Sequence, residues 1–278
     1  MMSWQCRWKS QWKSRWGSRA AALFFCWPLL CAMAGNCNAQ ELQLLTEEYP
    51  PMTFSDHGKP SGLAVEVVQE IQRRINDHGT ISVVPWARAY KLASNGPNAA
   101  VFTTMRTAER EHQFKWVGPF AVVTTSFYAL RGSGISIKNL QDAKAVGHIL
   151  VPREYYSNEV LTKLGFENLD NNAAKPEEML PMLAHHRGEL LVSDDQTLPS
   201  LLEKSAMDMS QLELAYSFLR TSSYLAFSRD TPDTVIARWQ GALDDMKRDG
   251  SFNRIYAKWL PRITPPGIAG EPEVILKK

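Results

Sequence analysis

The stretch from residue 42 to residue 104 alternates apolar runs of strand length with amphipathic segments of helical period. Strands are expected over residues 42–46, 81–84 and 99–104, and helices over 63–75 and 87–93. In the first helix, apolar residues recur every three or four positions and charged residues take the opposite face. A strand–helix–strand order of this kind requires parallel pairing with helical crossovers. The stretch therefore predicts an α/β fold.

The second half of the chain repeats this pattern, so two α/β units, and hence two lobes, are expected. Its last part is helical: Thr231 is expected to cap a helix that ends at Gly250, and a final helix covers residues 251–259. A loose tail is expected over 265–278, which holds three prolines and two glycines. The remaining expected strands are 124–130, 145–151, 190–193, 212–218 and 224–227, and the remaining helices are 140–143, 157–164, 176–186 and 196–204.

The first 39 residues have the features of a secretory signal. Five basic residues and no acidic residue precede the apolar block 20–34, which is too short for a membrane span and is interrupted by Pro28. An N-terminal membrane anchor is the alternative. We therefore expect export to the periplasm, with residues 1–39 removed.

Removal of this segment changes what the rest of the chain can be. All four cysteines lie within it, so residues 40–278 contain no disulfide, no cysteine-ligated zinc and no thiol nucleophile. The formal charge also changes, from +2 for the whole chain to −3 for residues 40–278. Nucleic-acid binding is therefore not expected. Spacings typical of metal ligands, such as His-Glu-x-x-His, are absent from the sequence, and neither a metal nor another cofactor is expected.

Residues 101–120 combine hydroxyl and guanidinium groups at one junction. Thr103 and Thr104 end an expected strand, Thr107 is placed to cap a following helix, and Arg106 and Arg110 flank that cap. Helix N-termini favour anions, and arginine binds a carboxylate with two parallel hydrogen bonds. The junction therefore predicts an anion site. The alternative is that Thr107 only caps the helix and Arg110 only pairs with Glu109 or Glu111 at the surface.

Several short motifs in a fixed order carry a resemblance to a known family. The chain resembles the bacterial periplasmic solute-binding proteins of family 3, of the polar amino-acid-binding type. The matching segments span nearly all of residues 40–278; they are 49–54, Gly58, 62–67, 85–89, 106–111, Phe114, 118–120, 225–228 and 249–259.

The resemblance implies a fold, lobe boundaries and a set of site residues. It implies a two-lobed α/β periplasmic-binding-protein fold of type II, with two hinge strands and the ligand in the cleft between the lobes. Lobe one would comprise 40–126 and 226–264, and lobe two 127–225. Arg110 would hold a ligand carboxylate, and Asp194 or Asp195 its ammonium group. The other residues expected at the cleft are Tyr49, Phe54 and Trp86 as aromatic walls, with Arg88, Thr103, Thr104 and Arg106.

One segment departs from the family pattern. Members that bind amino acids usually carry a Gly-Ser/Thr-Thr type turn at the helix N-terminus of the second lobe. Here the corresponding residues 152–157 read Pro-Arg-Glu-Tyr-Tyr-Ser, which are bulky and charged. This departure leaves Tyr155 or Arg153 to line the pocket, and points to a larger or differently charged ligand.

The function expected from these features is solute binding without catalysis. The protein, expected to be a monomer, would capture a small polar solute, an amino acid or related carboxylate, and deliver it to an inner-membrane ABC permease. One alternative is a ligand sensor for a signalling protein. Another is a periplasmic dehydratase or lyase on the same fold, whose acid–base candidates would be Glu47, Glu48, His185, His186, Asp194 and Asp195.

Overall fold

The computed structural model describes residues 41–268 and 274–276, so the expected signal segment, 1–39, lies outside the described residues. The described chain is α/β, as predicted. The strands are β1 (Gln43–Thr46), β2 (Phe54–Asp56), β3 (Lys59–Ser61), β4 (Thr80–Val83), β5 (Ala99–Met105), β6 (Phe114–Leu130), β7 (Ile149–Leu150), β8 (Leu169–Asp170), β9 (Leu190–Asp194), β10 (Leu212–Ser228) and β11 (Val274–Ile275). The helices are α1 (Leu63–Ile75), α2 (Trp86–Asn95), α3 (Leu140–Lys144), α4 (Tyr156–Lys163), α5 (Met179–Ala184), α6 (Leu198–Lys204), α7 (Asp233–Arg248) and α8 (Ser251–Trp259), with short 3-10 helices η1 (Pro176–Glu178) and η2 (Met209–Gln211).

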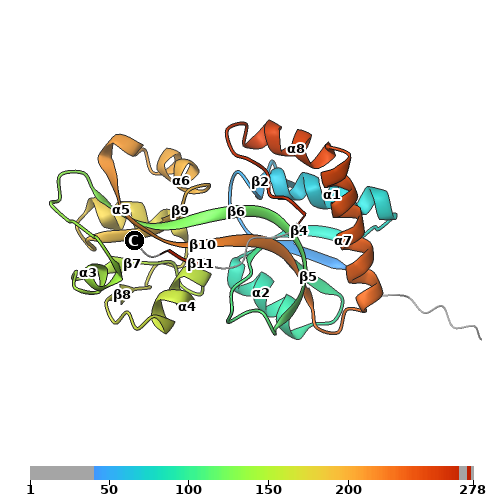
Figure 1. Cartoon of the computed structure of the whole chain (residues 1–278), viewed down its shortest axis with the longest axis horizontal. Helices are drawn as coiled ribbons and strands as arrows, with labels where there is room; N and C mark the ends of the chain where they lie inside the picture. The colour runs from blue at the N-terminus through green and yellow to red at the C-terminus, as the bar shows by residue number, and fades with distance from the viewer. Residues whose placement is uncertain (1–40, 269–273, 277–278) are drawn as a thin grey trace, which may run out of the picture. The chain divides into compact units, whose positions relative to one another are not determined.

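One mixed sheet of nine strands runs through the described chain. Its order is β4-β1-β5-β10-β6-β9-β7-β8, with β11 added against β10, while β2 and β3 form a separate hairpin. The long strands β6 and β10 pair antiparallel and connect the two halves of the sheet (Figure 1). We call β1–β5 with α1, α2, α7 and α8 lobe one, and β7–β9 with α3–α6 lobe two. The boundaries expected from the sequence, 126/127 and 225/226, fall inside β6 and β10.

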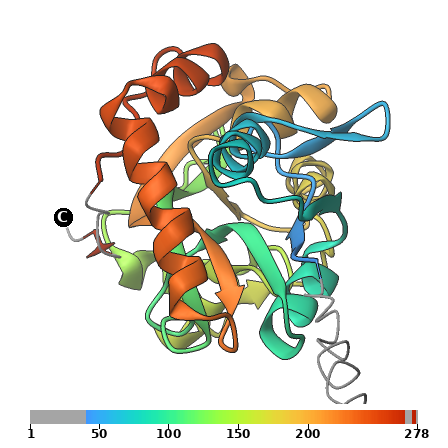
Figure 2. The ribbon, with the colours of Figure 1, turned by 90° about the vertical axis from the view of Figure 1, so that its right-hand side faces the viewer.

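Lobe one is a parallel sheet segment covered on both faces. Because strand side chains alternate between faces, Leu44 and Phe102 pack with α1, α7 and α8, while the neighbouring Leu45 and Val101 pack with α2. In Figure 2, where lobe one faces the viewer, α7 crosses the front of the sheet, and α8 lies at the top of the view, beyond the C-terminal end of α7. Burial on both faces explains the continuous apolar runs in these strands.

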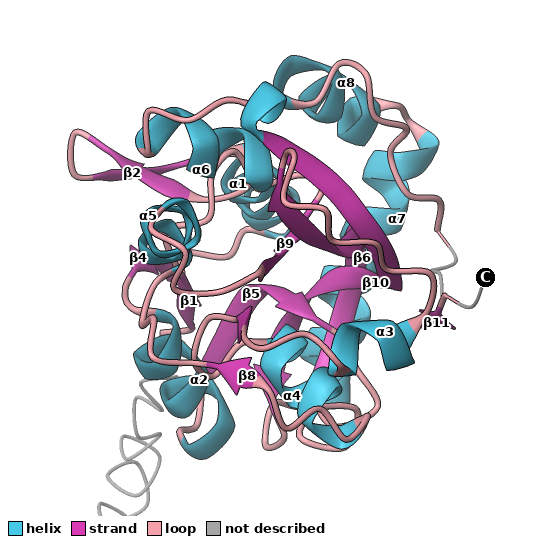
Figure 3. Ribbon diagram, turned by 90° about the vertical axis from the view of Figure 1, so that its left-hand side faces the viewer, coloured by secondary structure: helices cyan, strands magenta, loops and turns pink. Residues whose placement is uncertain are grey.

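Lobe two uses the same alternation on a smaller scale. Ile149 and Leu190 face the cluster that includes helix α4, while Leu150 and Leu191 face α5 and α6. Figure 3, seen from the lobe-two side, shows α3 and α4 on one side of the strands and α5 and α6 on the other. None of the helices described in either lobe is long and apolar enough to cross a membrane.

The helix expected after Thr107 is absent, which corrects the sequence interpretation. Residues 107–113 instead form successive turns, in which Arg110 N donates to Thr107 O at 3.1 Å and Gln113 N donates to Arg110 O at 2.9 Å. Strand β6 already begins at Phe114, so too few residues remain for repeated i→i−4 bonds. Thr107 therefore caps no helix.

The two separate late strands, 212–218 and 224–227, were also expected wrongly, because they are parts of one strand, β10, and its partner β6 runs through the dipeptide Gly118-Pro119. Strands β6 and β10 are each continuous. The register of their pairing shifts next to Tyr224, opposite Gly118-Pro119. Side chains of α7 replace the missing ladder bonds: Gly118 N donates to Gln240 Oε1 at 2.9 Å, and Lys247 Nζ donates to Pro119 O at 2.8 Å. Satisfied backbone groups allow proline inside a strand, at a bulge.

Smaller differences concern helix starts and the C-terminus. Helix α7 begins at Asp233 with Pro232 as its N-cap, so Thr231 is not the capping residue. Helices α1 and α8 match their expected bounds, 63–75 and 251–259. Within the segment expected to be a loose tail, Val274 and Ile275 form β11, which pairs antiparallel with Arg220 and Leu219 of β10. Main-chain pairing at that position had no sequence signal.

The loop that follows β1 is fixed by one glycine. Leu63 N and Ala64 N, at the start of α1, donate to Pro51 O and Met52 O at 3.1 and 2.9 Å. Gly62, between β3 and α1, has φ +118°, and a Cβ there would lie 2.4 Å from Met52 O of that loop. No L-residue with a side chain fits this backbone without strain.

Replacing Gly62 by alanine should therefore destabilise the protein by roughly 2 kcal/mol or more, measured by urea unfolding. Gly241→Ala is the matched control: a Cβ at this α7 position meets nothing within 4 Å, so the same change should raise stability by about 0.5–1 kcal/mol. Equal effects of the two substitutions would contradict the role assigned to Gly62.

Candidate functional site

The candidate site lies where the strand ends of the two lobes face each other. Lobe one contributes the loop after β1, the N-terminus of α2 and the turns after β5, and lobe two contributes residues 152–159 and the turn after β9. In open α/β sheets, ligands bind in the crevice outside the carboxyl ends of the strands. Several side-chain contacts join the lobes across this crevice, and four of them lie next to the candidate site.

Tyr49 makes the first contact. Its backbone is held by a pair of hydrogen bonds with Thr53, of 2.7 and 3.0 Å, and Thr53 Oγ1 also donates to Glu47 O at 2.7 Å. From this fixed loop, the Tyr49 hydroxyl donates a short hydrogen bond to Asp194 Oδ2 in lobe two. Burial, and then the adjacent Asp194, raise the pKa of Tyr49 well above its ordinary value, so the hydroxyl stays protonated as a donor.

Asp194 is the acceptor of several hydrogen bonds from its own turn. Its Oδ1 accepts from Gln196 N and Thr197 N, both at 3.0 Å, and its Oδ2 accepts from Thr197 Oγ1 at 2.8 Å in addition to Tyr49. The side chain is buried, whereas its neighbour Asp195 is exposed and accepts a hydrogen bond from Thr124 N of β6 at 3.1 Å. Of the two aspartates, Asp194 is the one that contacts lobe one.

Arg110 and Glu159 make the second contact, which is a bidentate ion pair. Arg110 Nε donates to Glu159 Oε2 at 2.9 Å and a terminal nitrogen donates to Oε1 at 2.6 Å. Arg110 is only 1% exposed, and its guanidinium carbon lies 5.2 Å from the Trp86 ring centroid and 4.9 Å from that of Tyr90. The guanidinium is thus enclosed by two rings and one carboxylate.

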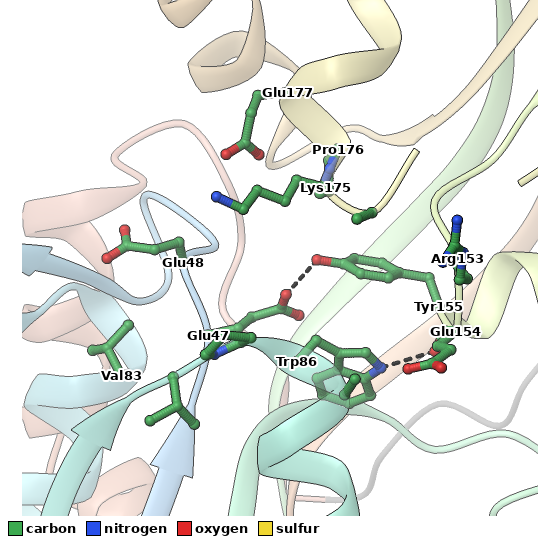
Figure 4. Close-up of a pocket in the computed structure, with 14 residues that line it drawn as sticks. Glu47, Glu48, Val83, Trp86, Arg153, Glu154, Tyr155, Lys175, Pro176 and Glu177 are labelled. Carbon is green, nitrogen blue, oxygen red and sulfur yellow. Dashed lines mark hydrogen bonds between the residues drawn. The ribbon is translucent and has the colours of Figure 1, made fainter. Parts of the chain in front are cut away.

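Glu47 and Trp86 make the remaining two contacts with residues 154–155. The Tyr155 hydroxyl donates a short hydrogen bond to Glu47 Oε2, and Trp86 Nε1 donates to Glu154 O at 2.8 Å (Figure 4). Burial raises the pKa of Glu47 to about 8, although the Tyr155 hydrogen bond and the positive charge of Arg110 oppose that shift. Glu47 is therefore mostly a neutral carboxyl group at pH 7.

A cavity of about 410 Å³ opens beside these contacts, within the size range of small-molecule sites. Its aromatic walls are Trp86 and Tyr155, and Figure 4 shows charged side chains from both lobes around it. Four carboxyl groups and two cationic groups line it: Glu47, Glu48, Glu154, Glu177, Arg153 and Lys175. Among the residues that the structure describes, no cluster of three or more histidine, cysteine, aspartate or glutamate side chains could hold a metal.

The space directly at Arg110 is far smaller. About 10 Å³ remains between Arg110, Thr103 and Tyr156, which is close to the space of one water molecule. Glu47, Trp86 and Tyr155 line both this space and the large cavity. These three residues therefore lie between the guanidinium of Arg110 and the 410 Å³ cavity.

The structure brings six of the expected site residues together and leaves five elsewhere. The six residues that line the cavity or the spaces beside it are Tyr49, Trp86, Thr103, Arg110, Tyr155 and Asp194. The five that do not join them are Phe54, Arg88, Thr104, Arg106 and Asp195.

The positions of these five have local explanations. Phe54 packs edge-on against Trp259 of α8, and Arg88 is exposed on α2. The Thr104 hydroxyl donates to Val101 O at 3.1 Å within its own strand. Arg106 forms a bidentate pair with Glu111 at 2.7 and 2.6 Å, so the surface-pair alternative describes Arg106 rather than Arg110.

Sequence reasoning missed Glu159, Tyr90 and Thr197. Each sits on a segment that was expected correctly or nearly so, but no short-range pattern marks which residue of a helix or turn faces the other lobe. The unusual residues 152–157 were the available signal, because they showed that this turn differs from the usual carboxylate-binding turn. The residue that takes over, Glu159, lies just beyond them.

Comparisons with known proteins agree with this architecture. Residues 43–262 match the family model described as bacterial extracellular solute-binding proteins, family 3. No curated protein matches.

Solved structures extend the likeness to the whole fold. A histidine kinase sensor domain with similarity to periplasmic binding proteins is 20% identical with a TM-score of 0.73, covering 81% of this chain and 98% of its own. A mutant of ArgBP from T. maritima is 17% identical with a TM-score of 0.67, covering 80% and 96%. The ancestral amino-acid-binding protein AncCDT-1, a precursor of cyclohexadienyl dehydratase, is 16% identical with a TM-score of 0.65, covering 79% and 95%. At these identities the likeness concerns the two-lobed fold alone.

The raised pKa of Glu47 has a measurable consequence for stability. Between pH 4.5 and about 8, the folded protein keeps a proton on Glu47 that the unfolded chain releases, so the contribution of Glu47 is greatest below pH 4.5 and is lost as the pH rises to about 8. The free energy of unfolding, measured in urea at pH 5 and pH 8, should therefore fall less with pH in Glu47→Gln than in the unchanged protein, by up to a few kcal/mol. Parallel pH profiles for the two proteins would argue against a buried, protonated Glu47.

Proposed function

Because the chain belongs to the bacterial extracellular solute-binding proteins of family 3, we propose that it captures a small polar solute between its two lobes in the periplasm. The closed form would then be presented to an inner-membrane ABC importer. The signal-like residues 1–39 support export. A ligand-sensing role would use the same closure and differ only in the partner.

The observation that carries this proposal is the 410 Å³ cavity walled by both lobes. Glu47, Val83 and Trp86 come from lobe one, whereas Glu154, Tyr155 and Pro176 come from lobe two. A solute in this cavity would contact both lobes at once and so bind the closed arrangement more tightly than an open one. Differential affinity of this kind is what shifts a conformational equilibrium.

The proposal is for binding without chemical conversion. Glu47, a buried carboxyl group with a raised pKa, is the strongest acid–base candidate among the site residues, and its Oε2 accepts from the phenol of Tyr155. A general acid also needs the reacting atom within hydrogen-bond reach and a partner group for the return of the proton. We therefore expect a bound solute to be recovered unchanged by mass spectrometry after prolonged incubation.

A thermal-shift panel with purified residues 40–278 tests the proposal. The panel contains amino acids, because Arg110 and Asp194 are the expected anchors of their two charged groups. It also contains amines, dicarboxylates, opines and small peptides, because both anchors already have partners within the chain. A solute at one hundred times its Kd should add about 2.7 kcal/mol of stability, a shift of several degrees in Tm. Absence of any shift across the panel would count against solute binding.

For a solute identified in this way, Trp86→Ala should weaken binding at least tenfold, because the indole is an aromatic wall of the cavity. Isothermal titration calorimetry would measure the change, after circular dichroism has verified the fold. Leu92→Ala is the control, since Leu92 lies on the exposed side of the same helix and is 39% exposed. Similar losses in both variants would show that the effect comes from α2 as a whole and not from the indole.

A further inference from the structure

The guanidinium of Arg110 is already engaged by a carboxylate of the chain itself. The two hydrogen bonds to Glu159, of 2.9 and 2.6 Å, have the bidentate geometry with which an arginine holds a ligand carboxylate. Trp86 and Tyr90 cover the guanidinium, and only about 10 Å³ remains beside it. A second carboxylate has no room at Arg110 in the closed cleft.

The carboxylate of Asp194, which could hold a ligand ammonium group, is likewise already paired within the chain. Its two oxygens accept four hydrogen bonds from Tyr49, Gln196 and Thr197. The two groups that could anchor an amino acid by its α-carboxylate and α-ammonium are therefore both paired within the chain. The solute must be recognised somewhere else in the cleft.

Lobe closure would also bring Glu159 next to a solute carboxylate that had bound Arg110 in the open form. Arg110 belongs to lobe one and Glu159 to helix α4 of lobe two, so the two meet only when the lobes approach. A solute carboxylate on Arg110 would then face the carboxylate of Glu159 beside the buried guanidinium. Like charges in that position oppose closure, which is a way to reject one class of ligand.

The adjacent cavity favours the opposite charge. Trp86 and Tyr155 offer aromatic faces. With Glu47 mostly neutral, the three other carboxyl groups in the walls, Glu48, Glu154 and Glu177, still outnumber the two cationic groups. Aromatic rings together with carboxylates are the usual surroundings of organic cations.

We propose that Glu159 sets the ligand specificity of this protein by occupying Arg110, so that the cleft excludes free carboxylates and takes small organic cations that carry an amine and no carboxylate. This inference rests on the proposed solute-binding function and names its ligand class. It replaces the amino acid expected from the sequence with the corresponding decarboxylated amine.

Matched pairs of probes that differ only in the carboxylate test the inference directly. Agmatine with arginine, cadaverine with lysine, and histamine with histidine would be titrated calorimetrically into the protein and into Glu159→Gln and Glu159→Asp. In the unchanged protein, at least one amine should bind at least tenfold more tightly than its amino acid. Glu159→Gln removes the charge and keeps the side-chain length, so it should reduce that ratio at least tenfold, whereas Glu159→Asp should preserve the preference for the amine.

Glu109→Gln is the matched control for the loss of one charge and one contact between the lobes. Glu109 pairs with Lys163 of α4 at 2.6 Å, in an ion pair that does not include Arg110. This variant should leave the amine-to-acid ratio unchanged, even if closure weakens for all probes alike.

Three results would overturn the inference. An amino acid that binds the unchanged protein as tightly as its amine would do so, as would an unchanged ratio in Glu159→Gln. Failure of all three amines to bind would do so as well. In each case, solutes that bind from the wider panel would still support solute binding, whereas an entirely silent panel would also remove the proposed function. If Glu159→Gln does not fold, the comparison in the unchanged protein decides.

Discussion

The antiparallel ladder between β6 and β10 is the interaction on which both lobes depend. Strand β10 continues the sheet into lobe one through β5, and β6 continues it into lobe two through β9. Every change in the angle between the lobes must therefore pass through this two-stranded connection. The ladder is irregular at three places, and bulges bend and twist strands. This irregularity gives the connection a place to deform while the sheets on either side stay packed.

The elements that could be predicted from the sequence are those whose burial follows one local period. Helix α1 is an example, because its apolar stripe begins and ends within the helix itself. The continuous β6 could not be predicted, since Gly118-Pro119 normally breaks a strand and the groups that repair the break, Gln240 and Lys247, come from more than a hundred residues later. The expected helix after Thr107 is absent for a similar reason, because the start of β6 at Phe114 leaves too few residues to form it.

The positions of the expected site residues follow the same division, and their role in binding stays a prediction. Arg110, Trp86 and Tyr155 were expected from motifs or from a departure from them, and they do lie at the cleft. The choice between Asp194 and Asp195 required the pleat of β9 and the position of Tyr49, which are tertiary facts. The role of Glu159 depends on how one lobe closes on the other, and a single chain read in order contains no such information.

The short strand β11 has a practical consequence for work with this protein. It pairs with Leu219 and Arg220 of β10, just past the positions where β10 pairs with β5, so it covers an edge that would otherwise be open. Leu276 N donates to Phe218 O at 2.8 Å and continues this cover. Unpaired strand edges are templates for pairing with other chains. Removal of the residues from Val274 onward would therefore expose an unpaired edge of β10 that could pair with another chain. Purification tags are better placed away from this end.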